Sequence, residues 1–270
     1  MKKTERGQRY IASPLNNPML NYGEYYMTFG EKLLYLLALM AAGGLAGQVF
    51  YGGLFRRDGV NTTATYISNA IVFVLVGGIA AKAFMPVIND MLKNRRKKKL
   101  SSQFRDFLDV LATSLSAGNT INDAFLGARG DLLHQYQEND YIIRELTEIG
   151  SGIQNGVSLE IMLKNFGDRS ADEDIENFSN VIGNCYKLGG NFKDVVRKTK
   201  DIINDKMAIA DEIETKLASN KMQLNAMSLM PVVLVGMLKL ASASFAENLR
   251  SFVGVAVTTI AVAMFVGAYF

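Results

Sequence analysis

The sequence predicts an all-α, polytopic membrane protein with four transmembrane helices and a cytoplasmic helical bundle between the second and third of them. Apolar residues make up 49% of the 270 residues and charged residues 20%. The apolar residues gather in four runs, each close to the roughly 20 residues that a helix needs to cross a bilayer. Between Pro86 and Pro231 there is no proline, and strand-like alternation is scarce, which favours helices.

Four segments are expected to cross the membrane. A polar tail, residues 1–32, precedes the first of these segments. The apolar run of that first segment is longer than the apolar core of a cleavable signal peptide. We therefore expect the chain to stay in the membrane. The predicted spans are 33–55, 65–88, 223–240 and 251–270.

The orientation follows from the basic residues, which are enriched on the cytoplasmic side of membrane helices. Five precede the first span (Lys2, Lys3, Arg6, Arg9, Lys32) and a basic run follows the second at 93–99, whereas the other loops hold Arg56, Arg57, Lys239 and Arg250. Both termini and the domain at 89–222 are therefore expected in the cytoplasm.

The basic run is expected to lie at the membrane surface, where anionic lipids attract cations. Its composition also fits nucleic-acid binding, but the adjoining span favours lipid contact, and no nucleic-acid partner is expected. The residues concerned are Lys93, Arg95, Arg96, Lys97, Lys98 and Lys99.

Within the cytoplasmic domain, three similar stretches predict joints between helices: GNTINDAF (118–125), GVSLEIML (156–163) and GGNFKDVV (189–196). In each, a glycine is expected to end one helix in the left-handed conformation, and a Thr, Ser or Asn two residues later to cap the next. The joint residues are Gly118, Asn119 and Thr120, then Gly156 and Ser158, then Gly189, Gly190 and Asn191.

These joints divide the domain into helices over 100–117, 120–128, 140–155, 158–166 and 171–188, and one long helix that begins at Asn191. The first should bury one face, formed by Leu100, Phe104, Phe107, Leu108, Leu111 and Leu115. Ser170 is expected to cap the fifth, with Glu173 at capping-box spacing. The long helix should continue into the third span, because no Gly or Pro occurs before Pro231, which should kink it.

The sequence offers little for catalysis. It has one cysteine and one histidine, Cys185 and His134, and it lacks the nucleotide-binding and hydrolase motifs. Acids at the start of the helix 171–188 suit the helix dipole better than a metal. We therefore expect no catalytic residue, no metal and no cofactor. A transporter is also disfavoured, because the spans offer only Gln48, Ser68 and Asn69 as polar groups at mid-membrane.

Small residues at close-packing spacing occur in the first two spans, Gly43 with Gly47 and Gly77 with Ala81. Such pairs let helix backbones approach closely, although ordinary lipid-facing helices also contain small residues. Self-association is expected along Gly43 and Gly47.

The cytoplasmic segments resemble a known family. The stretches FRDFLDVLATSLSAGNTINDAF (104–125), IGSGIQNGVSLEIMLKNFGDRS (149–170) and VIGNCYKLGGNFKDVVRKTKDII (181–203) are similar to the F domain of type II secretion and type IV pilus systems. A single copy with two spans on each side most resembles the inner-membrane platform proteins of tight-adherence (Flp) pili.

The resemblance implies a non-enzymatic platform that couples a cytoplasmic hexameric secretion ATPase to the extraction of pilin subunits. It further implies a homo- or hetero-oligomer, often with a sister platform protein, with the ATPase contact on the cytoplasmic domain. Glu145 and Glu148 are proposed for that contact as exposed acids. A membrane-tethered scaffold or signalling protein is the alternative, and a neighbouring secretion ATPase gene would favour the platform.

Overall fold

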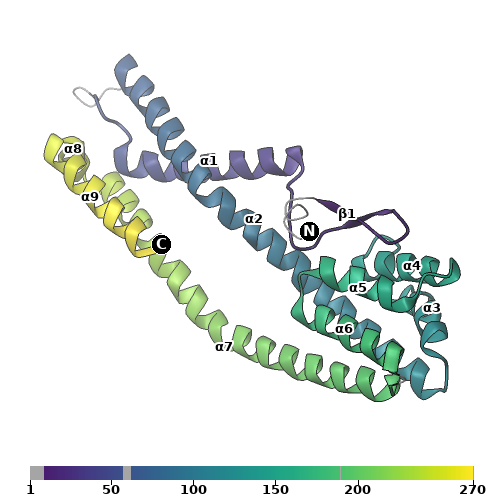
Figure 1. The fold of residues 1–270 in the computed structure, drawn as a ribbon. Coiled ribbons are helices and arrows are strands. Elements are labelled where there is room, and N and C mark those ends of the chain that lie inside the picture. The colour runs from purple at the N-terminus through teal and green to yellow at the C-terminus, as the bar shows by residue number, and fades with distance from the viewer. Residues whose placement is uncertain (1–8, 57–61, 189, 270) are drawn as a thin grey trace. The chain divides into compact units, whose positions relative to one another are not determined.

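The computed structural model describes residues 9–56, 62–188 and 190–269 (Figure 1). The chain divides into two compact units. The core unit combines the described residues up to Tyr26 with Asn89–Glu214, and the span unit combines Met27–Ile88 with Thr215 onward. An all-α membrane-type fold is thus confirmed, with one short hairpin added.

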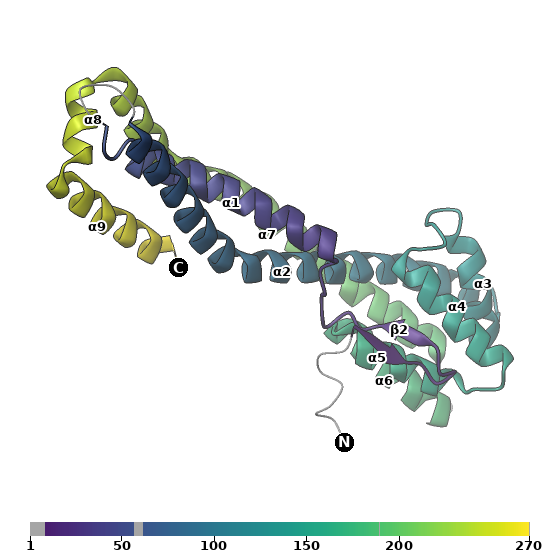
Figure 2. The same cartoon turned by 90° about the horizontal axis from the view of Figure 1, so that it is seen from above.

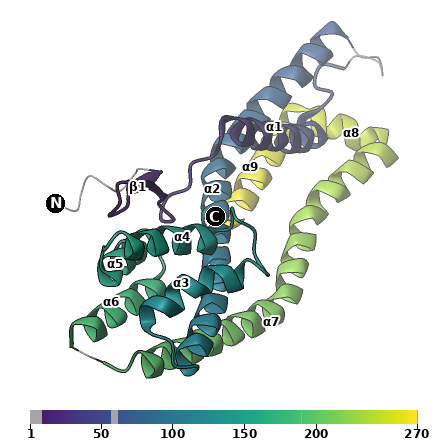
Figure 3. The same ribbon diagram turned by 90° about the vertical axis from the view of Figure 1, so that its right-hand side faces the viewer.

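The core unit contains four helices between its two long ones. These are α3 (Ile121–Leu132), α4 (Tyr141–Gln154), α5 (Leu159–Ser170) and α6 (Glu173–Leu188). Figure 3 shows them next to the C-terminal part of α2 (Thr63–Ser116). The expected helices at 120–128 and 158–166 are present but run several residues further, to Leu132 and Ser170.

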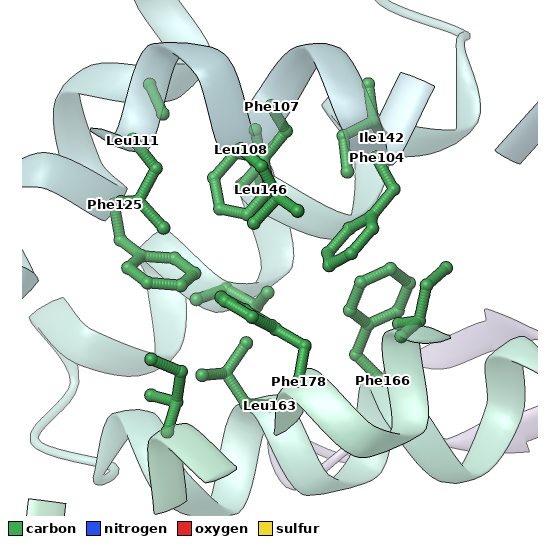
Figure 4. Packing of buried hydrophobic residues seen from close by; sticks show 14 of the residues in the cluster. Phe104, Phe107, Leu108, Leu111, Phe125, Ile142, Leu146, Leu163, Phe166 and Phe178 are labelled. Atoms are coloured by element: carbon green, nitrogen blue, oxygen red, sulfur yellow. The ribbon is translucent and has the colours of Figure 1, made fainter. Parts of the chain in front are cut away.

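The predicted apolar face of the first cytoplasmic helix forms the centre of the core. Leu100, Phe104, Phe107, Leu108, Leu111 and Leu115 are all buried. Figure 4 shows four residues of this row facing aromatic and aliphatic side chains of the shorter helices; they are Phe104, Phe107, Leu108 and Leu111. The rings of Phe104 and Phe178 meet edge to face with centroids 5.3 Å apart, and Phe107 lies 5.2 Å from Phe125. Such aromatic pairs add to the hydrophobic stabilisation of the bundle.

Two helices belong to both units. α2 contains the second expected span, the basic run and the first cytoplasmic helix in one stretch of 54 residues. The sequence predicted two separate helices, the span 65–88 and the helix 100–117, with the basic run 93–99 between them. α7 (Phe192–Ala241) is a helix of 50 residues, which confirms the expected continuous helix from the cytoplasmic domain into the third span. Pro231 lies inside it, and the helix continues beyond.

The joints at Gly118 and Gly156 are confirmed. Both glycines have positive φ, 93° and 77°, a conformation that glycine adopts without the steric cost of a Cβ. Thr120 caps α3, because its hydroxyl accepts a bond from the amide of Asp123 at 3.2 Å. Ser158 occupies the N-cap position of α5, but in this described segment its side chain does not accept the expected hydrogen bond from a backbone amide.

The third joint is described only in part, because Gly189 lies outside the described residues. The amide of Gly190 donates to the carbonyl of Cys185 at 3.0 Å. Asn191 and Asp194 pair at the start of α7, where the Asn191 Nδ2 donates to Asp194 Oδ2 at 2.7 Å and its Oδ1 accepts from the Asp194 amide at 3.4 Å. Asn191 therefore acts as the expected cap.

The expected cap at Ser170 is wrong. Ser170 is the last residue of α5, fully buried, and Ala171 takes the left-handed conformation with φ 51°. Asp172 caps α6 instead, since its Oδ1 accepts a bond from the amide of Asp174 at 3.0 Å. A serine and an aspartate two residues apart are both good caps, so the sequence did not distinguish them.

Gly118 offers a test of the joint. We expect Gly118→Val to lower the free energy of unfolding of the core unit by about 1–2 kcal/mol, because a Cβ is strained at positive φ. Nothing lies within 4 Å of the added atom, so crowding contributes nothing. Gly130→Ala, in the exposed interior of α3, is the control and should stabilise by about 0.4–1 kcal/mol. Equal melting temperatures for wild type and Gly118→Val would refute the joint.

The span unit holds the apolar helices. Its elements are α1 (Phe29–Tyr51), the first part of α2, the last part of α7, α8 (Ala243–Arg250) and α9 (Phe252–Tyr269). Among the described residues, α1, α2 and α7 are long and apolar enough to cross a membrane. α8 and α9 are bent by 82° relative to each other and together form a fourth candidate.

Candidate functional site

A buried polar site lies between α4 and α5. Glu145 and Arg169 form a two-pronged ion pair there, with Nη1 to Oε1 at 2.9 Å and Nη2 to Oε2 at 2.6 Å. Their side chains are 1% and 2% exposed. Such a pair matches the planar guanidinium to the carboxylate and satisfies both charges without water.

The N-terminal segment closes this site. Strands β1 (Tyr10–Ala12) and β2 (Pro18–Leu20) form an antiparallel hairpin, with Ile11 opposite Met19 (Figure 2). Tyr22, which follows the hairpin, is 1% exposed. Its hydroxyl donates to Glu145 Oε1 at 2.9 Å, and its amide donates to the carbonyl of Arg169 at 3.0 Å.

A second carboxylate holds the turn of the hairpin. Glu148, one helical turn after Glu145, accepts a bond from the hydroxyl of Ser13 and one from Asn17 Nδ2 at 3.0 Å. On α5, Asn165 Nδ2 donates to the carbonyl of Ala12 at 3.3 Å. The hairpin is therefore fastened to two helices through polar side chains.

The expectation that Glu145 and Glu148 are exposed is wrong, since both are buried. The sequence presented them as acids on a polar helix, and the segment that covers them looked like a polar tail. The available signal was the turn-forming stretch Asn16-Asn17-Pro18 between residues of strand type. These two carboxylates instead hold the hairpin and the residue that follows it.

Burial and neighbouring charges shift the pKa of Tyr22 and the pKa of Arg169. Burial, then the charge of Glu145 and the hydrogen bond to it, raise the pKa of Tyr22 well above its ordinary value. Burial opposes the charge on Arg169, but the hydrogen bond and charge of Glu145 raise its pKa overall. The network is thus arranged for a neutral tyrosine and a charged ion pair.

Alkaline pH should test this arrangement. Because the folded pKa lies above the ordinary tyrosine value of about 10, Tyr22 stays protonated in the folded chain while it ionises in the unfolded chain. Its contribution to the free energy of unfolding is therefore complete below about pH 10 and falls as the pH rises. We expect the stability difference between wild type and Tyr22→Phe to shrink by about 1.4 kcal/mol for each pH unit above pH 10. Melting curves of both proteins at about pH 9, 10 and 11 measure this difference. A difference that stays the same at all three pH values would contradict the prediction.

The basic run 93–99 is partly engaged within the core unit. The Arg96 guanidinium lies 4.3 Å from the ring centre of Tyr25 and donates to the carbonyl of Glu24 at 3.3 Å. Lys98 pairs with Glu214 and Lys99 with Asp140, both at 2.6 Å. In the described part of the chain, no ion pair involves Lys93, Arg95 or Lys97. Lipid contact by the run stays a prediction.

The small residues of the first two spans meet each other inside the span unit. A Cβ on Gly43 would lie 2.5 Å from the Cβ of Ala80, and one on Gly77 would lie 2.5 Å from the carbonyl oxygen of Met40. A Cβ on Gly47 would lie 3.0 Å from Val76. Ala81, at the end of this seam, is 5% exposed. The seam thus joins α1 to α2 within one chain, and self-association along Gly43 and Gly47 stays a prediction.

Within the described residues, no group of three or more His, Cys, Asp or Glu side chains is placed to hold a metal ion. The acids at the start of α6 serve other ends, since Asp172 caps the helix and Asp174 pairs with Lys206 at 2.9 Å. Both acids thus make contacts within the core unit.

Comparison with known proteins identifies one family. Residues 107–239 match the family model described as Type II secretion system (T2SS), protein F. The match begins in α2, covers α3 to α6 and ends near the end of α7. No curated protein and no solved structure matches the chain.

Proposed function

We propose, from the type II secretion system protein F domain that this chain carries at residues 107–239, that it is the non-enzymatic inner-membrane platform of a type IV pilus or type II-like secretion machine. The domain itself indicates a platform-type protein of these systems. The apolar helices of the span unit indicate a multi-pass membrane protein. We further propose that the chain couples a secretion ATPase to pilin extraction and belongs to the tight-adherence subtype.

The observation that best supports coupling is helix continuity. α2 and α7 both contain a stretch able to cross a membrane and a stretch that belongs to the core unit, and each is one continuous helix. An α-helix rises 1.5 Å per residue and is far stiffer than a loop. A displacement or rotation imposed on the domain would therefore reach the membrane along two rigid connections.

The packing of the core unit is consistent with a domain that transmits force. The hairpin covers one side of its aromatic and aliphatic core. The Glu145–Arg169 pair links α4 to α5 at the same place. Well-packed interiors transmit strain. We propose that the ATPase binds the exposed surface of this unit, that pilin subunits and a sister platform protein contact the spans, and that both termini are cytoplasmic.

Deletion and complementation in the native host test the function. Cells without the chain should make pilin but fail to assemble or export it, and the full-length chain should restore assembly. Pilin precursors should then accumulate in the inner membrane. Normal surface filaments or secretion in the deletion strain would refute the platform function, and the scaffold or signalling alternative would gain support.

A further inference from the structure

A cationic cavity lies in the span unit near the junction of α7 and α8. Its volume is about 610 Å³, and Arg56, Lys239, Arg250 and Glu247 are among the residues that line it. Three basic side chains thus stand against one carboxylate. A concave site with surplus positive charge favours an anionic ligand.

Lys239 has a defined structural role in this cavity. Its ammonium group donates to three carbonyl oxygens at the end of α1, those of Gln48 at 3.4 Å, Val49 at 3.0 Å and Gly52 at 2.7 Å. A cation is favourable at this negative end of the helix dipole. Its three N–H donors are occupied, so Lys239 contributes charge to the cavity and leaves direct ligand contact to its neighbours.

Arg250 has a donor to offer. Its Nε is buried and has no hydrogen-bond partner among the residues that the structure describes. The guanidinium packs against Gly53, where a Cβ would lie 3.0 Å from Nε. A buried N–H group without an acceptor is unfavourable, so the site favours a ligand that brings an acceptor oxygen.

An apolar cavity of about 850 Å³ adjoins the cationic one, and Ser251 lines both. A helix about 10 Å wide and about 30 Å long, as needed to cross a bilayer, fills roughly 2,400 Å³. The cavity is therefore too small for a whole transmembrane helix and suits a thinner apolar chain. Side chains of the span-unit helices form its wall, among them Phe50, Val76, Val235, Phe245, Val257 and Val262.

We propose that the two cavities together bind one anionic phospholipid, with its phosphate at Arg250 in the cationic cavity and an acyl chain in the apolar cavity. A phosphate supplies the acceptor oxygens that a guanidinium binds best. Inorganic phosphate would satisfy the cationic cavity alone. The adjoining apolar cavity favours the lipid. In the expected topology, the lipid belongs to the leaflet opposite the core unit.

Lipid retention by the full-length chain tests the proposal. The chain is purified in mild detergent, and phosphatidylglycerol, phosphatidylcholine or inorganic phosphate is added in separate arms. Native mass spectrometry measures bound lipid, and the melting temperature reports stabilisation by a ligand that binds the folded chain. We expect phosphatidylglycerol to bind and stabilise, and phosphatidylcholine and phosphate to do so far less.

Matched variants locate the site. Arg250→Gln should weaken phosphatidylglycerol binding by roughly tenfold or more, because a charge-assisted hydrogen bond is lost. Glu247→Gln removes the one carboxylate among the named lining residues and should strengthen binding, which keeps the proposal testable if Arg250→Gln misfolds. Lys82→Gln, on α2 outside both cavities, should leave binding unchanged.

Three outcomes would overturn the proposal. Equal binding of the two lipids would remove the role of charge. Stabilisation by inorganic phosphate equal to that by phosphatidylglycerol would make the site one for a free anion. A copurifying polypeptide that phosphatidylglycerol does not displace would assign the apolar cavity to a protein.

Discussion

Arg169→Met should lower the free energy of unfolding of the core unit by about 3–5 kcal/mol. Methionine fills much of the same space with an apolar side chain, but it removes the counter-charge of Glu145, whose side chain is 1% exposed. The carboxylate then stays buried without a partner. It also breaks the bond from Arg169 Nη1 to the carbonyl of Leu20 at 3.0 Å, so the N-terminal hairpin should detach more readily.

An exposed ion pair on the same helix provides the control. Lys164 and Asp168 lie 3.6 Å apart with side chains 61% and 48% exposed. Lys164→Met should cost less than about 1 kcal/mol, because water screens an exposed pair. Urea titration of the full chain, followed by hydrogen exchange of core-unit amides, measures both. Equal losses for Arg169→Met and Lys164→Met would contradict a stabilising role for the buried pair.

A variant that lacks both charges separates the effect of the ion pair from the effect of side-chain packing at the same site. In Arg169→Met combined with Glu145→Leu, no buried charge is left alone, so the double variant should be more stable than Arg169→Met by itself. The hydroxyl of Tyr22 loses its acceptor in this variant, so full recovery is not expected. A double variant less stable than the single one would show that packing, not charge, dominates the site.

A flexible insertion in α7 should abolish pilin assembly. We propose to insert seven Gly and Ser residues after Leu217, where α7 passes from the core unit to the span unit. Such a linker behaves as a random coil, so displacement of the core unit would no longer reach the third span along this helix. The ATPase should still bind, because the core unit is unchanged.

An insertion of the same length provides the control. Seven residues rich in Ala, Glu and Lys continue the helix for nearly two turns, since the helix has about 3.6 residues per turn. The lengthened helix keeps its phase to within roughly 20° and should retain more assembly than the Gly/Ser insertion. Immunoblots of surface and membrane pilin measure the difference. Equal assembly by the two insertions would exclude α7 as a rigid connection.

Helix joints were predictable from the sequence because their signals are local. Gly118 and Gly156 each provide a backbone conformation that other residues resist, and Thr120 provides a cap within three residues. The buried face from Leu100 to Leu115 was likewise visible as a helical period. Local signals failed where two good caps competed, as with Ser170 and Asp172.

The buried network was not predictable, because its partners are far apart in the chain. Tyr22 meets Glu145 across 123 residues, and Ser13 meets Glu148 across 135. Nothing at Glu145 itself distinguishes an acid under a hairpin from an acid in water. For the same reason, the spacing of Gly43 and Gly47 predicted a close helix contact but not whether the partner was α2 of the same chain or a second copy.

Copurification tests the central claim most directly, namely that the F domain of this chain is the membrane anchor of a secretion ATPase. The full-length chain is isolated from native membranes in mild detergent, and quantitative mass spectrometry compares its partners with those of an unrelated inner-membrane protein. The account predicts that a hexameric secretion ATPase is enriched with this chain and is retained by the seven-residue Gly/Ser variant. Intact, folded chain without the ATPase would contradict the account.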